Sequence, residues 1–179
     1  MLKKDIPLYS AVLIIYLSII SLLYWQLSWA VVLLWLGASL GLVLYNLDHL
    51  AYLLWQVPGS QTALEFRRLL VKGDFKNGFS LLEKTCYQRD RLVGHSVVFQ
   101  LVLMVLTLFT LSSTVSPFGK GLVMGLFLYS LINQGLLLLR GKSIDCWFWQ
   151  LKMKLGQAGE AFYFIGVLFV FFFFSRLLI

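Results

Sequence analysis

Three side chains in this sequence have the chemistry to bind a metal ion or to move a proton: Asp48, His49 and His95. The two histidines are the only ones among 179 residues. Two imidazoles and one carboxylate can hold zinc or a similar divalent cation and leave positions open for water. Water bound to such a cation is acidified and can attack an ester or a phosphate at neutral pH. These three residues are therefore the candidate catalytic and metal-ligating residues.

The position of Asp48 directly before His49 restricts this ligand set. Adjacent residues of an α-helix point about 100° apart. Asp48 and His49 can therefore both bind one ion only where the helix unwinds. Otherwise one of the two orients a residue that binds the metal and does not touch the metal itself. His95 is distant in sequence, so the fold has to bring it to the other two.

The composition places these residues in an integral membrane protein. Hydrophobic residues make up 60% of the chain and charged residues only 13%, and the mean hydropathy of +0.84 is far above that of soluble domains. A helix needs about 20 apolar residues to cross a hydrocarbon core of roughly 30 Å. The apolar runs predict a single all-α membrane domain over residues 1–179 with about five transmembrane helices. We expect these spans over residues 6–24, 30–51, 96–113, 121–139 and 161–177.

The basic residues predict the orientation of this bundle, because Lys and Arg near helix ends stay on the cytoplasmic side. With the N-terminus inside, only Lys120 and Arg176 of the 15 basic residues face outward. We therefore expect an N-in, C-out protein of the cell inner (plasma) membrane. Its net charge of +7 then faces anionic lipid headgroups. Nucleic acid is not an expected partner, because the charges are divided among loops that offer bases no stacking surface.

The segment 58–93, between the second and third spans, has an organisation of its own. Pro58 and Gly59 end the preceding helix. The stretch TALEFRRLLVKG then predicts a short helix with Thr62 as its N-cap and Gly73 as its stop. A second basic amphipathic helix follows, which predicts a cytoplasmic hairpin on the inner leaflet. The alternative is a connector that only solvates the interface.

A shorter amphipathic stretch, KSIDCWFWQLKMKLG over residues 142–156, precedes the last span. Tryptophan is enriched where membranes meet water. We therefore expect Trp147 and Trp149 to anchor this segment at the interface.

The position of each polar residue along its predicted span gives its depth in the membrane. These depths place the polar groups in the cytoplasmic half of the bundle. A rise of 1.5 Å per residue places Asp48 near the headgroup level, and His95 opens the third span from the same side. Asn133 lies about 10 Å below that surface by the same rise. The functional interpretation is a shallow pocket open to the cytosol, in which Arg89, Arg91 and Asn133 bind an anionic substrate. Two alternatives remain: simple exposure at the interface, or a structural pairing of Asp48 with a basic residue such as Arg89 or Arg91, which would tie the second span to the third.

Two short motifs carry the candidate residues, LDH at 47–49 and RDRLVGHSVVF at 89–99. Together they resemble the membrane-bound metal-dependent hydrolase-like family of small inner-membrane proteins. That family has an aspartate–histidine pair in a PDxDH context and an HRxxTHS element that opens the next helix. Asp48 and His49 match the first motif, and His95 with Ser96 matches the second. The resemblance covers about residues 30–140.

The resemblance implies a helical membrane fold and a divalent metal such as zinc held by Asp48, His49 and His95. It also implies hydrolysis of a lipid-linked or headgroup-level ester or phosphodiester at the cytoplasmic face. One alternative is a non-enzymatic membrane scaffold whose basic loops bind anionic lipid or a cytoplasmic partner. A small transporter is less favoured, because the outer half of the bundle has almost no polar residues and the chain shows no inverted repeat.

Overall fold

The computed structural model describes residues 6–23, 28–45, 47–48, 52, 58–74, 77, 81, 92–113 and 116–178. All regular structure among these residues is helical, which confirms the predicted all-α class. The elements are α1 (Ile6–Leu23), α2 (Trp29–Tyr45), α4 (Gln61–Val71), α6 (Val97–Ser112), α7 (Pro117–Leu139), the 3-10 helix η3 (Asp145–Phe148) and α8 (Gln157–Leu178).

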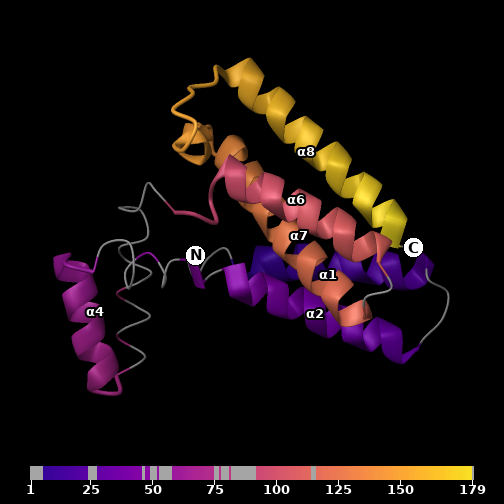
Figure 1. Ribbon diagram of the computed structural model, residues 1–179, viewed down its shortest axis with the longest axis horizontal. Helices are drawn as coiled ribbons and strands as arrows, with labels where there is room; N and C mark the ends of the chain where they lie inside the picture. The colour runs from indigo at the N-terminus through magenta and orange to yellow at the C-terminus, as the bar shows by residue number, and fades with distance from the viewer. Residues whose placement is uncertain are drawn as a thin grey trace.

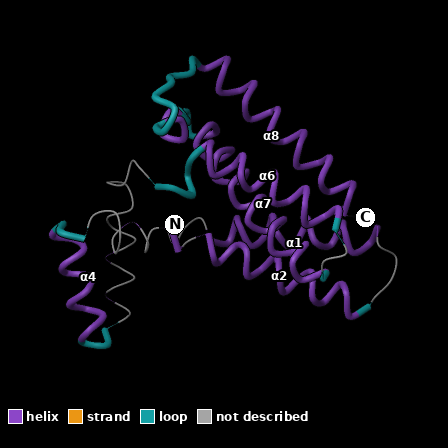
Figure 2. The backbone as a smooth tube through the Cα atoms, viewed as in Figure 1, coloured by secondary structure: helices purple, strands orange, loops and turns teal. Residues whose placement is uncertain are grey.

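Helices α1, α2, α6, α7 and α8 form a bundle, and α4 lies apart from it (Figure 1). The loops 92–96 and 140–156 lie at one end of this bundle, beside the last turn of α2 (Figure 2). We call this end the loop end. The loop 140–156 contains Arg140, Lys142, Lys152 and Lys154. Lys120 is in the first turn of α7 and Arg176 in the last turn of α8, and these two helix ends lie at the opposite end of the bundle (Figure 1).

Two of the described helices, α7 and α8, are long and apolar enough to cross a membrane, and α1, α2 and α6 are shorter apolar helices. Many large apolar side chains face outward from them, including Val105, Phe109, Phe162 and Phe169. An apolar surface this extensive is unusual for a protein surrounded by water. The helices and their surface indicate membrane association.

The helix ends differ from the predicted spans where capping residues decide them. Helix α7 begins at Pro117, four residues earlier than expected, because Ser116 accepts a hydrogen bond from the backbone N–H of Gly119 at 3.4 Å. Proline suits the first turn of a helix, where its missing N–H costs nothing. Helix α8 likewise begins at Gln157 rather than at residue 161.

The predicted N-cap of α4 is wrong by two residues. Ser60, not Thr62, caps the helix, and its side chain accepts a hydrogen bond from the backbone N–H of Ala63 at 3.1 Å. Ser60 directly follows the turn at Pro58 and Gly59 and is already extended, so the helix begins immediately after it. The stop is as predicted, since Gly73 has a φ of 72°. The predicted second helix of the hairpin falls almost entirely outside the described residues.

The closest helix packing in the bundle joins α2 and α7. Both helices have glycines four residues apart, Gly37 and Gly41 in α2 and Gly121 and Gly125 in α7. A Cβ atom built on any of the four would lie only 2.1–2.4 Å from a backbone carbonyl oxygen of the partner helix. The contacts run in the same order along both chains, so the two helices are parallel. This small-xxx-small packing lets backbones meet where lipid supplies no hydrophobic driving force between helices.

We expect Gly125→Ala to lower the free energy of unfolding by about 1–3 kcal/mol through overpacking. Its new methyl group would lie 2.3 Å from the carbonyl oxygen of Ala38. Gly166→Ala in α8 is the matched control, because its added methyl meets no atom within 4 Å and alanine favours a helix by up to about 1 kcal/mol over glycine. Unfolding of the detergent-solubilised protein, followed by circular dichroism, measures both. Equal stability of the two variants would contradict the close packing.

Candidate functional site

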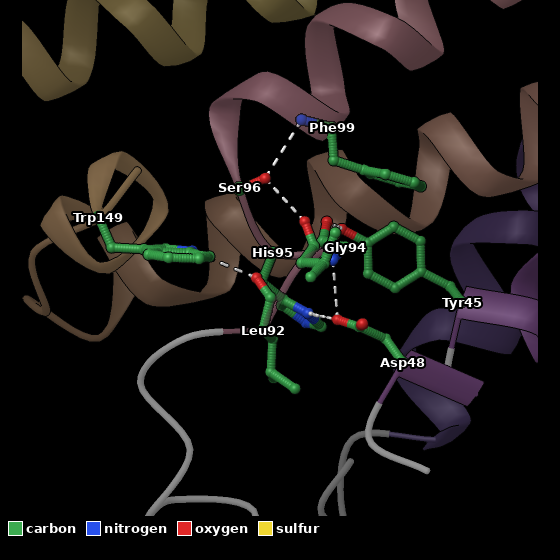
Figure 3. Close-up of polar contacts among 9 residues, drawn as sticks. Tyr45, Asp48, Leu92, Gly94, His95, Ser96, Phe99 and Trp149 are labelled. Carbon is green, nitrogen blue, oxygen red and sulfur yellow. Dashed lines mark hydrogen bonds and ion pairs between the residues drawn. The ribbon is translucent and has the colours of Figure 1, made fainter. Parts of the chain in front are cut away.

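The structure brings Asp48 and His95 into direct contact at the loop end (Figure 3). Asp48 lies just beyond the end of α2, and His95 lies in the turn that precedes α6. The Oδ2 atom of Asp48 is 3.3 Å from Nδ1 of His95 and accepts a hydrogen bond from the backbone N–H of Gly94 at 2.9 Å. Both side chains are largely buried, with exposed fractions of 14% for Asp48 and 15% for His95. The predicted meeting of these two residues is confirmed.

Local sequence explains why His95 stands where it does. Ser96 caps α6: its hydroxyl accepts from the N–H of Phe99 at 3.2 Å and donates to the carbonyl oxygen of Val93 at 2.7 Å. Gly94 gives the turn room, since a Cβ there would lie 3.0 Å from the Asp48 carboxylate. The turn is thus fixed on both sides, by the helix cap and by Asp48.

Tyr45, the last residue of α2, packs against the same turn. Its hydroxyl donates a hydrogen bond to the carbonyl oxygen of Gly94, as Figure 3 shows. Its ring meets the imidazole of His95 edge-on, with 5.1 Å between ring centroids. Tyr45 lies three residues before Asp48, which is one helical turn, so both side chains reach the same neighbour. Sequence analysis did not single out Tyr45, although this spacing was a readable signal.

The segment 140–156 closes the other side of His95, and the predicted role of Trp147 is wrong. Trp147 is 1% exposed and its ring centroid lies 5.5 Å from that of His95, so it is a packing residue and not an interfacial anchor. Trp149 is half-buried and donates from Nε1 to the carbonyl oxygen of Leu92 at 3.4 Å. Tryptophans beside lysines have the composition of a membrane anchor. Only the tertiary fold reveals that this loop turns inward.

Glu160, in the first turn of α8, holds this loop in place. It is 4% exposed and accepts hydrogen bonds from the hydroxyl of Ser143 and from the backbone N–H of Ile144, the latter at 3.2 Å. A carboxylate at a helix N-terminus is also favoured by the helix dipole. Asp145 adds a hydrogen bond from the backbone N–H of Leu155 at 3.0 Å. The loop 140–156, which holds Trp147, is therefore fixed by the carboxylates of Glu160 and Asp145.

A buried amide pair lies deeper in the bundle, below the Asp48–His95 contact. Gln134 donates from Nε2 to Oε1 of Gln100 at 2.8 Å, and Tyr163 donates to the same oxygen. Both glutamines are completely buried. Hydrogen bonds between helices in lipid contribute roughly 0.6–1.7 kcal/mol each. This cluster joins α6, α7 and α8 beneath the candidate site.

The remaining predicted site residues do not all join the pair. His49, Arg89 and Arg91 lie outside the described residues. Asn133 on α7 accepts a hydrogen bond from the hydroxyl of Tyr9 at 3.3 Å. A chain of ring contacts runs from Tyr9 through Tyr129 and Tyr45 to His95, so three tyrosine rings separate Asn133 from the imidazole. Asn133 therefore contacts α1 rather than the Asp48–His95 pair.

The separation of the two donor atoms permits a metal ion as well as a hydrogen bond. Zinc bonds to nitrogen and oxygen are about 2.0–2.2 Å long, and a tetrahedral angle then separates two ligand atoms by about 3.3–3.5 Å. The observed 3.3 Å from Asp48 Oδ2 to His95 Nδ1 lies within that range. Within the described residues no group of three or more His, Cys, Asp or Glu side chains gathers. The third predicted ligand, His49, belongs to the part of the chain that the structure leaves undescribed.

Comparison of the chain with protein-family models, with curated proteins and with solved structures found no match.

We expect Asp48→Ala to lower the free energy of unfolding by about 1–3 kcal/mol, because it leaves the buried N–H of Gly94 without an acceptor. Asp48→Asn is the matched variant: its amide oxygen still accepts that hydrogen bond, so its loss should be smaller. Chemical denaturation in detergent measures both. If Asp48→Ala is as stable as the wild type, the contact does not hold α2 to the α6 turn.

Proposed function

We propose that this chain is a multi-pass protein of the cell inner membrane with five spans, an inside N-terminus and an outside C-terminus. Helices α1, α2, α6, α7 and α8 supply these spans, and their apolar outer surfaces support the assignment. The basic residues support the orientation, since the loop end carries four described ones, Arg140, Lys142, Lys152 and Lys154. Positive charge is retained on the cytoplasmic side. The loop end therefore faces the cytosol.

We infer further that the Asp48–His95 pair is the centre of a metal-dependent hydrolase. The observation that carries this proposal is the contact itself, which joins residues 47 positions apart at a separation that suits two ligands of one zinc ion. The motif resemblance around LDH and GHS points to the same residues. A divalent ion bound there would supply acidified water for attack on an ester or phosphodiester.

The neighbouring residues position this pair. The Gly94 N–H fixes one oxygen of the Asp48 carboxylate, and the Tyr45 and Trp147 rings hold the imidazole plane of His95. Contacts of this kind hold the side chains that could bind an ion in a fixed orientation. The substrate class is a lipid-linked or headgroup-level ester or phosphodiester, because the pair lies at the end of the bundle where headgroups meet the cytosol. Anionic substrates would be attracted by the basic residues of the loop end.

A purified, detergent-solubilised protein should carry about one divalent ion per chain, measured by plasma mass spectrometry. Asp48→Asn and His95→Ala should each retain at least about tenfold less metal and should lose hydrolysis of a chromogenic phosphodiester or ester in mixed micelles. Asp145→Asn is the matched control, because it changes a carboxylate of the same end that contacts Leu155 instead of His95. The proposed hydrolase would be contradicted if the wild-type protein is metal-free, or if the variants bind as much metal as the wild type.

One observation favours a second candidate function, a non-enzymatic scaffold that binds anionic lipid. One face of α4 carries Leu64, Arg67, Arg68, Val71 and Lys72, all exposed and spaced three or four residues apart. The opposite face, with Ala63 and Phe66, is buried. A helix with exposed apolar and basic side chains on one face suits an anionic interface. If the wild type and all variants are metal-free, and the protein still binds anionic vesicles in preference to neutral ones, the scaffold is the function that remains.

A further inference from the structure

An apolar groove of about 440 Å³ lies between α1, α7 and α8. Apart from Tyr16, its lining consists of apolar residues and one glycine. Its rims expose Leu8, Ile15 and Phe172. We propose that this groove binds one acyl chain of an anionic phospholipid from the cytoplasmic leaflet. The proposal rests on the membrane orientation inferred above and is independent of the Asp48–His95 chemistry.

The length of the groove fits one leaflet. On α7 the lining runs from Leu128 to Leu139, a rise of about 17 Å at 1.5 Å per residue. One leaflet contributes about half of a hydrocarbon core of roughly 30 Å, or about 15 Å. A lipid whose headgroup lies beside Leu139 would therefore have its acyl chain ending near the other end of the groove.

Near the far end of the groove, α1 and α8 contact each other. The hydroxyl of Tyr16 lies 3.1 Å from that of Ser175, and its ring centroid lies 5.2 Å from that of Phe171. Tyr16 stands near the middle of α1. A transmembrane helix from a second copy would need a groove that continues through both leaflets, about 30 Å. The length of the groove and this contact between α1 and α8 favour a lipid tail over a helix as the occupant.

The open end of the groove has positive charge. Helix α7 ends at Leu139, and the next residue, Arg140, is its exposed C-cap. Lys142 follows and is also exposed. Basic residues at this level attract anionic headgroups. An anionic lipid therefore fits both regions of the groove. Its acyl tail would lie against the apolar lining, and its headgroup would lie beside Arg140 and Lys142 at the open end.

Gly135 gives the groove its depth. It faces Phe164 of α8, whose ring tip would lie 3.2 Å from a Cβ built at this position. A larger side chain at residue 135 would fill the space between α7 and α8. By contrast, the shallow apolar hollow on α6 is lined by that helix alone, by Leu101, Val102, Val105, Leu106 and Phe109. That hollow has no second wall to hold a chain.

The test is native mass spectrometry of the full-length protein released from micelles that contain phosphatidylglycerol or phosphatidylcholine. The wild type should retain one phosphatidylglycerol and prefer it to phosphatidylcholine. Arg140→Gln should reduce that preference about fivefold, which is the effect of one basic residue near a headgroup. Gly135→Leu and Ile132→Trp should both lose the retained lipid. Val105→Trp, which places the same bulk on the α6 hollow, should retain it.

Groove variants that keep the lipid as well as Val105→Trp does would overturn the proposal. A lipid-free dimer of the wild type would also overturn it, because a second copy would then be the occupant. Circular dichroism of each variant checks that it is folded. If one of the two groove variants does not fold, the other still provides the test. Labelling of Lys142→Cys from the outer side of whole cells would show a failed orientation separately. Loss of metal without loss of lipid would show a failed hydrolase and leave the groove intact.

Discussion

The backbones of α2 and α7 touch along two pairs of glycines, and the position of the candidate site follows from this contact. Any side chain at Gly37, Gly41, Gly121 or Gly125 would overlap the partner backbone. Because the two helices run parallel and in fixed register, the last turn of α2 reaches the loop end beside Tyr129 of α7. Asp48 is thereby presented to the turn before α6. In a lipid environment such packing replaces the hydrophobic effect as the force that holds helices together.

Polar groups then distribute unequally along the bundle. The loop end contains three hydrogen-bonded carboxylates, Asp48, Asp145 and Glu160. The buried pair of Gln100 and Gln134 lies beneath them. Except for Asp145, each has hydrogen-bond partners on another segment, so the polar groups connect helices that glycine packing alone would leave unlinked. Buried polar groups are stable only when satisfied in this way. The opposite half is tied mainly by hydroxyls, such as Tyr16 with Ser175 and Trp35 with Ser21. Chemistry is therefore concentrated at one face of the bundle, which is the face that we assign to the cytosol.

The sequence predicted the helical class, the approximate helix positions and the approach of Asp48 to His95, because hydropathy and helical rise set depth along a span. It did not predict which helices touch, although the four-residue glycine spacing in α2 and α7 was a readable signal. Trp147 was assigned to the interface because composition alone cannot show that its loop folds inward onto His95. Ser60 rather than Thr62 caps α4, since two hydroxyl residues compete and the preceding turn decides between them. The roles of His49, Arg89 and Arg91 stay predictions.

We expect Nδ1 of His95 to donate a hydrogen bond to Asp48, and nitrogen NMR of ¹⁵N-histidine-labelled protein tests this most directly. In a His49→Gln background, His95 is the only histidine, so its ring signals are assigned at once. An ionised carboxylate only accepts hydrogen bonds. In metal-free protein whose His95 ring is neutral, we therefore expect the ring proton on Nδ1. The ¹⁵N signal of Nδ1 should change in Asp48→Asn. A proton on Nε2 that is unaffected by Asp48→Asn would contradict the account.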